Sequence, residues 1–212
     1  MRFSLAVLCL LSIYAVTPEA YSQPSSSTGT PKPQKQHKPD DTVGVVRGVL
    51  ITYRDFRYQL KGILHEHFSE IKGDSVSGED FTKFVNMAWD KMVSDVLVEQ
   101  EIKKKKLTLT KQEVIKRLEA NPPELISKSF TDSLGVVHAK EMKAFLENPA
   151  QDSLRDKVLL YYETSFEEED FLKKLAPKAK TDDDRKKALD AWVAEVLKHT
   201  PLDDRRVAFG FY

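Results

Sequence analysis

The residues with the clearest potential for chemistry are His65 and His67, which flank Glu66. Imidazole and carboxylate groups are common ligands of Zn²⁺, so this triplet is a candidate metal site. In a helix, however, residues i and i+2 point about 200° apart, so the two imidazoles cannot reach one ion. Ser69 also stands where a zinc-protease pattern needs its second histidine. A solvent-exposed helix face therefore explains the triplet better, and we predict no metal site and no cofactor.

Three well-known catalytic or cofactor-binding motifs are also missing from the sequence. It has no Gly-x-Ser-x-Gly motif, no Gly-rich phosphate loop and no dinucleotide fingerprint. The acidic run at residues 167–170 is typical of a solvent-exposed helix face, with a partner-binding patch as the alternative. The 33 basic and 33 acidic residues balance, so charge gives no reason to expect nucleic acid as a partner. We predict that the chain is not an enzyme.

Residues 1–22 have the pattern of a secretory signal peptide. Arg2 gives a positive start, residues 3–16 are mostly apolar, and Pro18 ends the run before small residues that suit cleavage. The run is shorter than the roughly 20 residues that span a bilayer, which favours cleavage over the alternative of a membrane anchor. We therefore predict a periplasmic protein. Cys9 is the only cysteine, so the mature chain would form no disulfide.

The rest of the sequence divides by composition into a linker and a folded part. Residues 23–41 are rich in Pro, Ser, Thr and Lys, without an apolar side chain larger than proline. Such a segment cannot bury enough surface to offset its ordering entropy, so a flexible linker is expected. Residues 42–212 are long enough for one sizeable core or one extended helical domain. The predicted organisation is thus a signal peptide at 1–22, a linker at 23–41 and a folded domain at 42–212.

Hydrophobic spacing predicts that the folded part is mainly helical. Thr52 and Thr181 are expected N-caps, and Thr110 with Glu113 has the spacing of a capping box. Consecutive prolines after Asn121 separate two helices. The expected helices cover about residues 53–73, 79–106, 111–120, 124–129, 139–147, 152–175 and 182–200.

Strands are expected only at the two ends of the folded part. Residues 43–51 resemble a hairpin, because Gly48 can take the positive φ of a tight turn after Arg47. Residues 205–212 alternate apolar with small or polar side chains, which predicts a half-buried strand; a membrane-barrel strand is the alternative, but a barrel needs many such strands. An isolated hairpin is barely stable in water, so the two elements are expected to pair. The predicted fold class is mainly α with a small β element.

Three segments, in this order, resemble the N-terminal chaperone domain of the SurA and PpiD family. They are the hairpin and helix start at 43–56, the long helix and capped helix at 89–114, and the Asn-Pro-Pro-Glu-Leu segment and its continuation at 121–149. Arg47 and Lys106 depart from the pattern, because relatives commonly have Asn before the hairpin glycine and Gly after the long helix. The resemblance covers about residues 43–212 and implies a SurA N-terminal-like helical chaperone domain.

The resemblance also shows what this chain lacks. Members of the family carry one or two parvulin prolyl isomerase domains after the long helix, whereas residues 175–181 here lead directly into the last helix. Residues 186–212, with Trp192, resemble the returning helix and strand that complete the chaperone core. Prolyl isomerase activity is therefore not implied, because the residues that would carry it are absent.

The resemblance implies an exported, ATP-independent holdase-type chaperone for unfolded or partly folded envelope and outer-membrane proteins. Client proteins, outer-membrane proteins among them, are the expected partners together with an isomerase-bearing relative; nucleic acid and small-molecule substrates are not expected. The alternatives are a non-catalytic scaffold with one dedicated envelope partner and, third, an isomerase despite the missing domain. Candidate peptide-binding residues are aromatic, each with a core role as its alternative: Tyr53, Tyr58, Tyr161 and Tyr162.

Overall fold

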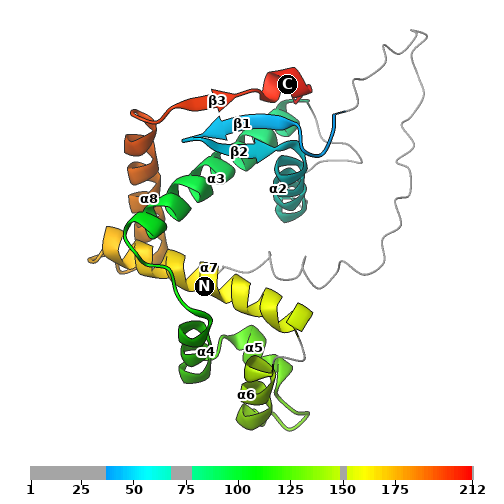
Figure 1. The fold of residues 1–212 in the computed structure, drawn as a ribbon, viewed down its shortest axis with the longest axis vertical. Coiled ribbons are helices and arrows are strands. Elements are labelled where there is room, and N and C mark those ends of the chain that lie inside the picture. The colour runs from blue at the N-terminus through cyan, green and yellow to red at the C-terminus, as the bar shows by residue number, and fades with distance from the viewer. Residues whose placement is uncertain (1–36, 68–77, 149–151, 212) are drawn as a thin grey trace, which may run out of the picture. The chain divides into compact units, whose positions relative to one another are not determined.

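The computed structural model describes residues 37–67, 78–148 and 152–211 (Figure 1). The predicted signal peptide, the first part of the predicted linker and the predicted end of the first helix near Gly73 lie outside these residues. The chain divides into two compact units. Of the described residues, 37–67, 78–96 and 195–211 belong to the first unit, and 97–148 and 152–194 belong to the second.

The first unit contains a three-stranded antiparallel sheet in the order β2-β1-β3. The strands are β1 (Thr42–Val46), β2 (Val49–Thr52) and β3 (Leu202–Asp204). In the hairpin between β1 and β2, Arg47 has a φ of 46° and Gly48 a φ of 81°. Two consecutive positive φ values match the twist of the flanking strands, so the hairpin turn that the sequence predicted is confirmed.

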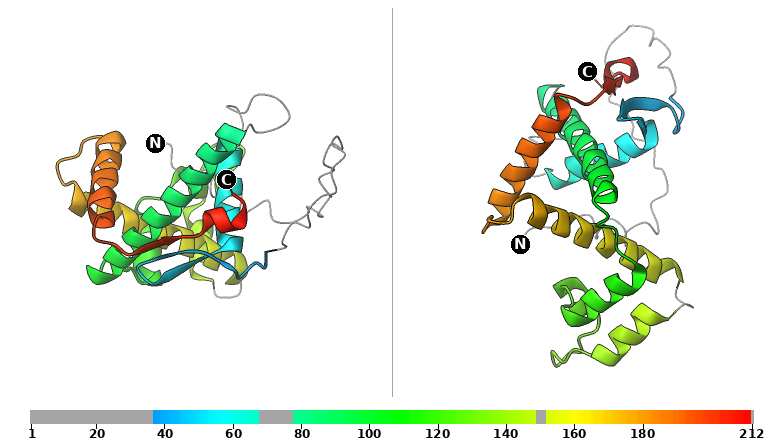
Figure 2. Two further views of the ribbon diagram at one scale, coloured as in Figure 1. Left: turned by 90° about the horizontal axis from the view of Figure 1, so that it is seen from above. Right: turned by 60° about the vertical axis from the view of Figure 1, so that its left-hand side comes forward.

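The C-terminal strand lies earlier than predicted. Strand β3 pairs with β1 through Val46 opposite Leu202 and Gly44 opposite Asp204, which confirms that the two ends of the folded part pair (Figure 2). The strand predicted at 205–212 is wrong, because Arg206–Phe209 forms a 3₁₀ helix, η3. The Arg206 side chain is buried and hydrogen-bonded to Asp204, so this stretch does not alternate between two faces. The fold class, mainly α with a small β element, is confirmed.

Helix α2 (Tyr53–Glu66) and the first part of α3 (Gly78–Lys104) complete the first unit. Thr52 caps α2 as predicted, with its hydroxyl accepting a hydrogen bond from the Asp55 N–H at 3.2 Å. Apolar side chains from the sheet, both helices and the C-terminal segment form the core, including Val43, Val46, Ile51, Phe56, Leu60, Phe84, Val85, Ala88, Trp89, Val93 and Phe211.

The end of the predicted linker contacts the first unit. The Asp41 carbonyl accepts a hydrogen bond from the Tyr53 N–H at 2.8 Å, and the Pro39 carbonyl accepts one from the Arg54 N–H at 2.9 Å. The His37 ring lies 4.4 Å from the Phe209 ring, measured between centroids. Residues 37–41 therefore cover the first turn of α2.

The described part of the second unit contains the end of α3 and five further helices. They are α4 (Lys111–Ala120), α5 (Glu124–Ser129), α6 (Ala139–Glu147), α7 (Asp152–Leu175) and α8 (Asp182–Leu197), of which the last few residues belong to the first unit. The capping box between Thr110 and Glu113 is present at the start of α4. None of the helices in the described parts of the chain is long and apolar enough to cross a membrane.

Two separate apolar clusters hold the second unit together. The larger one joins α4, α5, α6 and α7 through Val114, Leu118, Ile126, Met142, Leu146, Leu159 and Tyr162. The smaller one joins the end of α3 to the end of α7 through Val98, Ile102, Leu107 and Phe171, with Leu189 and Trp192 of α8 packed against it and half-buried. No residue of α8 is fully buried, so this helix covers its cluster incompletely.

Candidate functional site

The two predicted peptide-binding tyrosines of the first unit differ in exposure. Tyr53 is half-buried at the start of α2, stacked on Phe209 at 5.6 Å and tilted against Phe211 at 5.9 Å. Tyr58, one turn further along α2, is 60% exposed. Tyr53 thus contributes to packing at the C-terminal segment, whereas Tyr58 is free to contact a partner.

The two predicted tyrosines of the second unit lie together on α7. Their rings meet edge to face, with centroids 5.0 Å apart. Tyr162 belongs to the larger core cluster, and burial raises the pKa of its hydroxyl to about 12. Tyr161 is half-buried beside the same cluster. Client binding by any of these tyrosines stays a prediction.

The acidic run at residues 167–170 is not a uniformly solvent-exposed face. Glu167 accepts a hydrogen bond from the Leu109 N–H at 2.7 Å, and burial raises the pKa of its carboxyl. Asp170 accepts a hydrogen bond from the Arg117 guanidinium at 2.6 Å. Both carboxylates therefore connect α7 to α4 and the segment before it, and the expected solvent-exposed face is wrong for these two residues.

The histidine triplet also has a clear position. Glu66 ends α2, and His67 is its C-cap, with a backbone N–H that bonds the Ile63 carbonyl at 3.0 Å. The His67 ring lies 5.7 Å from the Phe84 ring. Among residues 37–67, 78–148 and 152–211, no group of three His, Cys, Asp or Glu side chains is placed to hold a metal ion.

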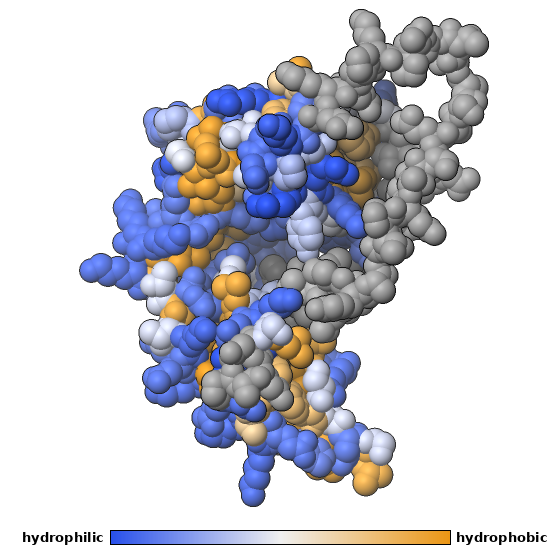
Figure 3. All heavy atoms as spheres, turned by 45° about the vertical axis from the view of Figure 1, so that its right-hand side comes forward, coloured by the Kyte–Doolittle hydropathy of each residue, from blue (hydrophilic) through white to orange (hydrophobic). Residues whose placement is uncertain are grey.

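Apolar side chains reach the surface in separate places. Figure 3 shows one face on which hydrophobic patches are interspersed among hydrophilic residues. In the second unit the exposed large apolar residues are Leu125, Leu134, Val136, Val137, Leu154 and Leu160; in the first unit they include Val49, Leu50, Tyr58, Leu202 and Val207. Scattered exposed apolar residues are normal on a protein surface, so a concave site with polar groups is a better indication of binding.

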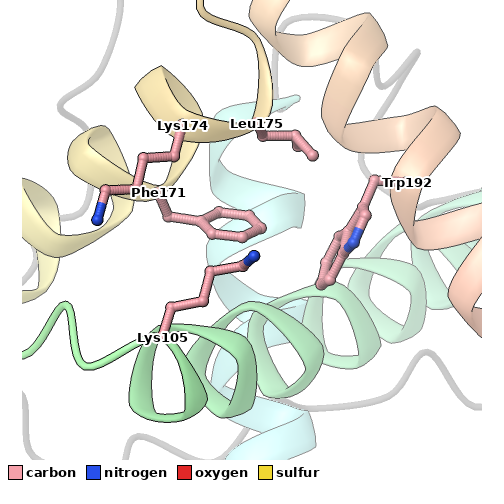
Figure 4. A pocket seen from close by; sticks show the side chains of 5 residues that line it. All are labelled: Lys105, Phe171, Lys174, Leu175 and Trp192. Atoms are coloured by element: carbon pink, nitrogen blue, oxygen red, sulfur yellow. The ribbon is translucent and has the colours of Figure 1, made fainter.

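The second unit has such a site, a pocket of about 240 Å³ that we call the α8 pocket (Figure 4). It is lined by two aromatic side chains, one leucine and two lysines: Phe171, Trp192, Leu175, Lys105 and Lys174. The Phe171 and Trp192 rings meet edge to face at 5.1 Å and 67°. Phe171 is buried and Trp192 is half-buried, so one wall of the pocket is fixed and the other is partly open.

The charge at the α8 pocket is positive. Figure 4 shows the Lys105 ammonium directed toward the gap between the Phe171 ring and the Trp192 indole, whereas the Lys174 ammonium points away from it. Lys105 forms an ion pair with Glu101 at 3.3 Å, and Glu101 is also 3.8 Å from Lys104. None of the residues that line the pocket is acidic. The pocket therefore combines an aromatic surface with a cation at its opening.

The other tryptophan, Trp89 in the first unit, lies in a sealed cluster. The Arg206 guanidinium lies 4.7 Å above its indole, and the Phe56 ring meets it edge to face at 6.3 Å. Arg206 is 7% exposed and donates hydrogen bonds to Asp204 at 2.7 Å and to the Asn86 side-chain oxygen at 2.9 Å. This cluster attaches η3 to α3, and its role is structural.

Sequence reasoning did not predict the α8 pocket. The lining residues fall in three separate helices of those expected from the sequence: Lys105 in 79–106, Phe171, Lys174 and Leu175 in 152–175, and Trp192 in 182–200. The sequence feature that could have predicted the pocket is the short Pro-containing connection at residues 176–181. A connection this short makes α7 and α8 neighbours in space.

Comparison with models of protein families identifies a family for this chain. The sequence model of a family described as SurA-like N-terminal domain matches residues 28–146, more than half of the chain. No curated protein and no solved structure matches the chain. The match includes Lys105 and ends before α7, so the other four residues that line the α8 pocket lie beyond it.

Proposed function

Because the chain belongs to the SurA-like N-terminal domain family, we propose that it is an ATP-independent holdase that binds unfolded or partly folded proteins. Membership of this family indicates a chaperone-type role that involves client proteins. The domain of this family is non-catalytic, and the function we propose needs only reversible binding. The family match is the observation that carries the proposal.

The location and the clients belong to the same proposal. The signal-peptide pattern of residues 1–22 supports export to the periplasm. A periplasmic holdase meets envelope and outer-membrane proteins before they fold, so these are the proposed clients. Such clients expose extended apolar segments, for which the chain needs accessible apolar surface.

Two features of the second unit supply accessible apolar surface. The α8 pocket has aromatic walls and is bounded by a helix without any fully buried residue. Leu154 and Leu160 of α7 are also exposed. Shallow apolar sites of this kind suit weak binding of many segments, because hydrophobic contact is non-directional.

A test of the proposal is suppression of aggregation by the purified mature chain without ATP. Two unrelated unfolded proteins are diluted from denaturant, one of them an outer-membrane barrel protein, and light scattering is followed. We expect protection of both at near-stoichiometric ratios, with weaker protection by Trp192→Ala. Tyr162→Phe serves as a control, because it removes only a hydroxyl from the larger core cluster. Protection of neither protein would contradict the holdase function.

A second candidate function, a scaffold with one dedicated partner, is favoured by the turn between α5 and α6. One oxygen of the Asp132 carboxylate accepts hydrogen bonds from the Leu134 and Val136 N–H groups, both at 2.9 Å. Thr131 and Val137 pair as an antiparallel bridge. This hydrogen-bonded turn holds Leu134 at 86% exposure. A pull-down that recovers a single envelope protein with the wild type, and none with Leu134→Ser, would support the scaffold.

A further inference from the structure

We propose that the α8 pocket binds an aromatic side chain of a client whose neighbouring residue is Asp or Glu, with Lys105 binding that carboxylate. This proposal rests on the holdase function and specifies which client segments the second unit selects. It concerns residues that lie mostly beyond the family match.

The size of the pocket suits a single side chain. An apolar cavity of about 150 Å³ in another protein accommodates benzene, whereas pockets for drug-sized ligands begin at about 300 Å³. The α8 pocket, at about 240 Å³, lies between these values. One phenyl or indole group from an extended chain therefore fills it.

The walls of the pocket favour an aromatic guest. Phe171 and Trp192 already meet edge to face, and aromatic rings prefer edge-to-face or offset contacts over parallel sandwiches. Trp192 comes from α8, which has no fully buried residue. A third ring can pack against the accessible side of this pair, because Trp192 is only half-buried.

The Lys105 ammonium at the opening of the α8 pocket determines which client residue is favoured next to the bound aromatic side chain. Figure 4 shows the Lys105 ammonium facing the ring pair, and 47% of the Lys105 side chain is exposed. A carboxylate next to a bound ring would meet this ammonium, whereas a lysine or arginine there would be repelled. A partly exposed pair of this kind is expected to change affinity by about fivefold.

Glu101 already pairs with Lys105 and must share it with the client. Glu101 is only 13% exposed and has Lys104 as a second cation at 3.8 Å. Lys105 can therefore turn to a client carboxylate while Glu101 keeps Lys104. Replacement of Glu101 by glutamine would release Lys105 and is expected to strengthen binding of acidic peptides.

The test uses the mature chain and four short peptides capped at both ends, with Phe-Asp, Phe-Asn, Phe-Lys or Ala-Asp at the centre. Binding is followed by the fluorescence of Trp192, with Trp192→Phe as the blank for the buried Trp89. We expect Phe-Asp to bind about fivefold more tightly than Phe-Asn, and Phe-Lys and Ala-Asp to bind more weakly than either. A fifth peptide, ending in Phe with a free carboxylate, tests a terminal carboxylate instead.

Variants assign the preference to Lys105. Lys105→Gln should remove the difference between Phe-Asp and Phe-Asn, and Glu101→Gln should increase it. Lys103→Gln is the matched control, because it makes the same charge change two residues away, pairs with Glu99 and not with Glu101, and does not line the pocket. An unchanged preference in Lys105→Gln, equal binding of Phe-Asp and Phe-Asn, binding of only the free-carboxylate peptide, or no binding at millimolar concentration would each overturn the proposal. If clients are still protected from aggregation in that case, the holdase function stands while this inference fails.

Discussion

The two tryptophans of this chain have similar partners and opposite accessibility. Trp89 of the first unit and Trp192 of the second each meet a phenylalanine ring edge to face, and each has a cation nearby. Trp89 is 3% exposed, whereas Trp192 is half-buried beside an open pocket. Residue types alone therefore do not distinguish a sealed cluster from an open pocket.

The difference lies in how each cation is held. Arg206 donates hydrogen bonds to Asp204 and to the Asn86 side chain, so its planar guanidinium is fixed over the Trp89 indole. Lys105 is a flexible cation with an ion pair to Glu101 and an exposed side chain. A buried, hydrogen-bonded cation closes the first cluster, whereas the partly exposed Lys105 leaves the second cluster open at the surface.

The largest effect on stability is expected from removal of the sealed tryptophan. Trp89→Ala should lower the free energy of unfolding by about 3–5 kcal/mol, because it creates a cavity next to Phe56 and leaves Arg206 without the indole beneath it. Denaturant unfolding followed by circular dichroism measures this change. A loss comparable to that of Trp192→Ala would break the contrast between the two clusters.

Arg206→Met should destabilise the first unit by about 2 kcal/mol at neutral pH, because Asp204 loses its partner and the indole loses its cation. Burial raises the pKa of Asp204, but hydrogen bonds from Arg206 outweigh this effect and hold the pKa below its usual value. A carboxyl whose pKa is lowered on folding stabilises the protein above its unfolded pKa and loses that contribution as the pH falls. The difference between wild type and variant should therefore shrink below about pH 4.

A difference that stays constant between neutral and acidic pH would assign the whole effect to packing of Arg206 on Trp89. Urea midpoints of wild type and variant, measured at several pH values, distinguish the electrostatic effect of Arg206 on Asp204 from its packing on Trp89. Burial raises the pKa of Asp90 and the Arg206 charge lowers it, so loss of Arg206 also raises the pKa of Asp90 in the variant. This second carboxyl acts in the same direction as Asp204, because its contribution to the difference also shrinks as the pH falls.

The next largest effect on stability is expected at Gly44, whose backbone lies against the Trp89 indole. An added Cβ at Gly44 would overlap the Trp89 indole and lie 2.7 Å from the Asp203 carbonyl oxygen. Gly44→Ala should therefore cost about 1–3 kcal/mol through overpacking. Gly62→Ala is the control, because its Cβ would meet nothing within 4 Å and Ala favours the helix by up to about 1 kcal/mol. A neutral Gly44→Ala would show that the first cluster is less tightly closed than its contacts indicate.

The smallest effect on stability is expected at the open tryptophan. Trp192→Ala should cost about 1–2 kcal/mol, because the indole is only partly buried and removes less apolar surface from water than Trp89 does. The same change should weaken protection of unfolded clients, measured by light scattering. A large loss of stability with unchanged protection would reverse the roles assigned to the two tryptophans.

Local signals explain the parts of the fold that were predicted well. The predicted bounds of α4, α5, α6 and α7 agree with the structure because a capping box, two prolines and an Asn-Pro pair lie at their ends. Gly48 and the residue before it take the positive φ values that a hairpin turn needs. Each of these signals acts within a few residues and needs no tertiary context.

The C-terminal segment shows where local signals fail. Its alternating pattern suggested a strand, but the side chain of Arg206 is buried against Trp89, Asn86 and Asp204, and the backbone turns into a 3₁₀ helix. The residues on α3 that contact Arg206 lie more than a hundred residues away in the sequence, so no short-range sequence pattern could predict these contacts.

The sequence by itself determined the helices, their caps, the hairpin turn and the membership of the SurA-like N-terminal domain family, because these depend on spacing along the chain. The tertiary structure decided which aromatic residues are sealed and which are open. Tyr162 and Trp89 are enclosed by neighbours from several elements, whereas Trp192 is on a helix that covers its cluster only in part. Burial is a property of contacts between distant residues, and the exposure of an aromatic side chain follows from packing that hydrophobic spacing does not encode.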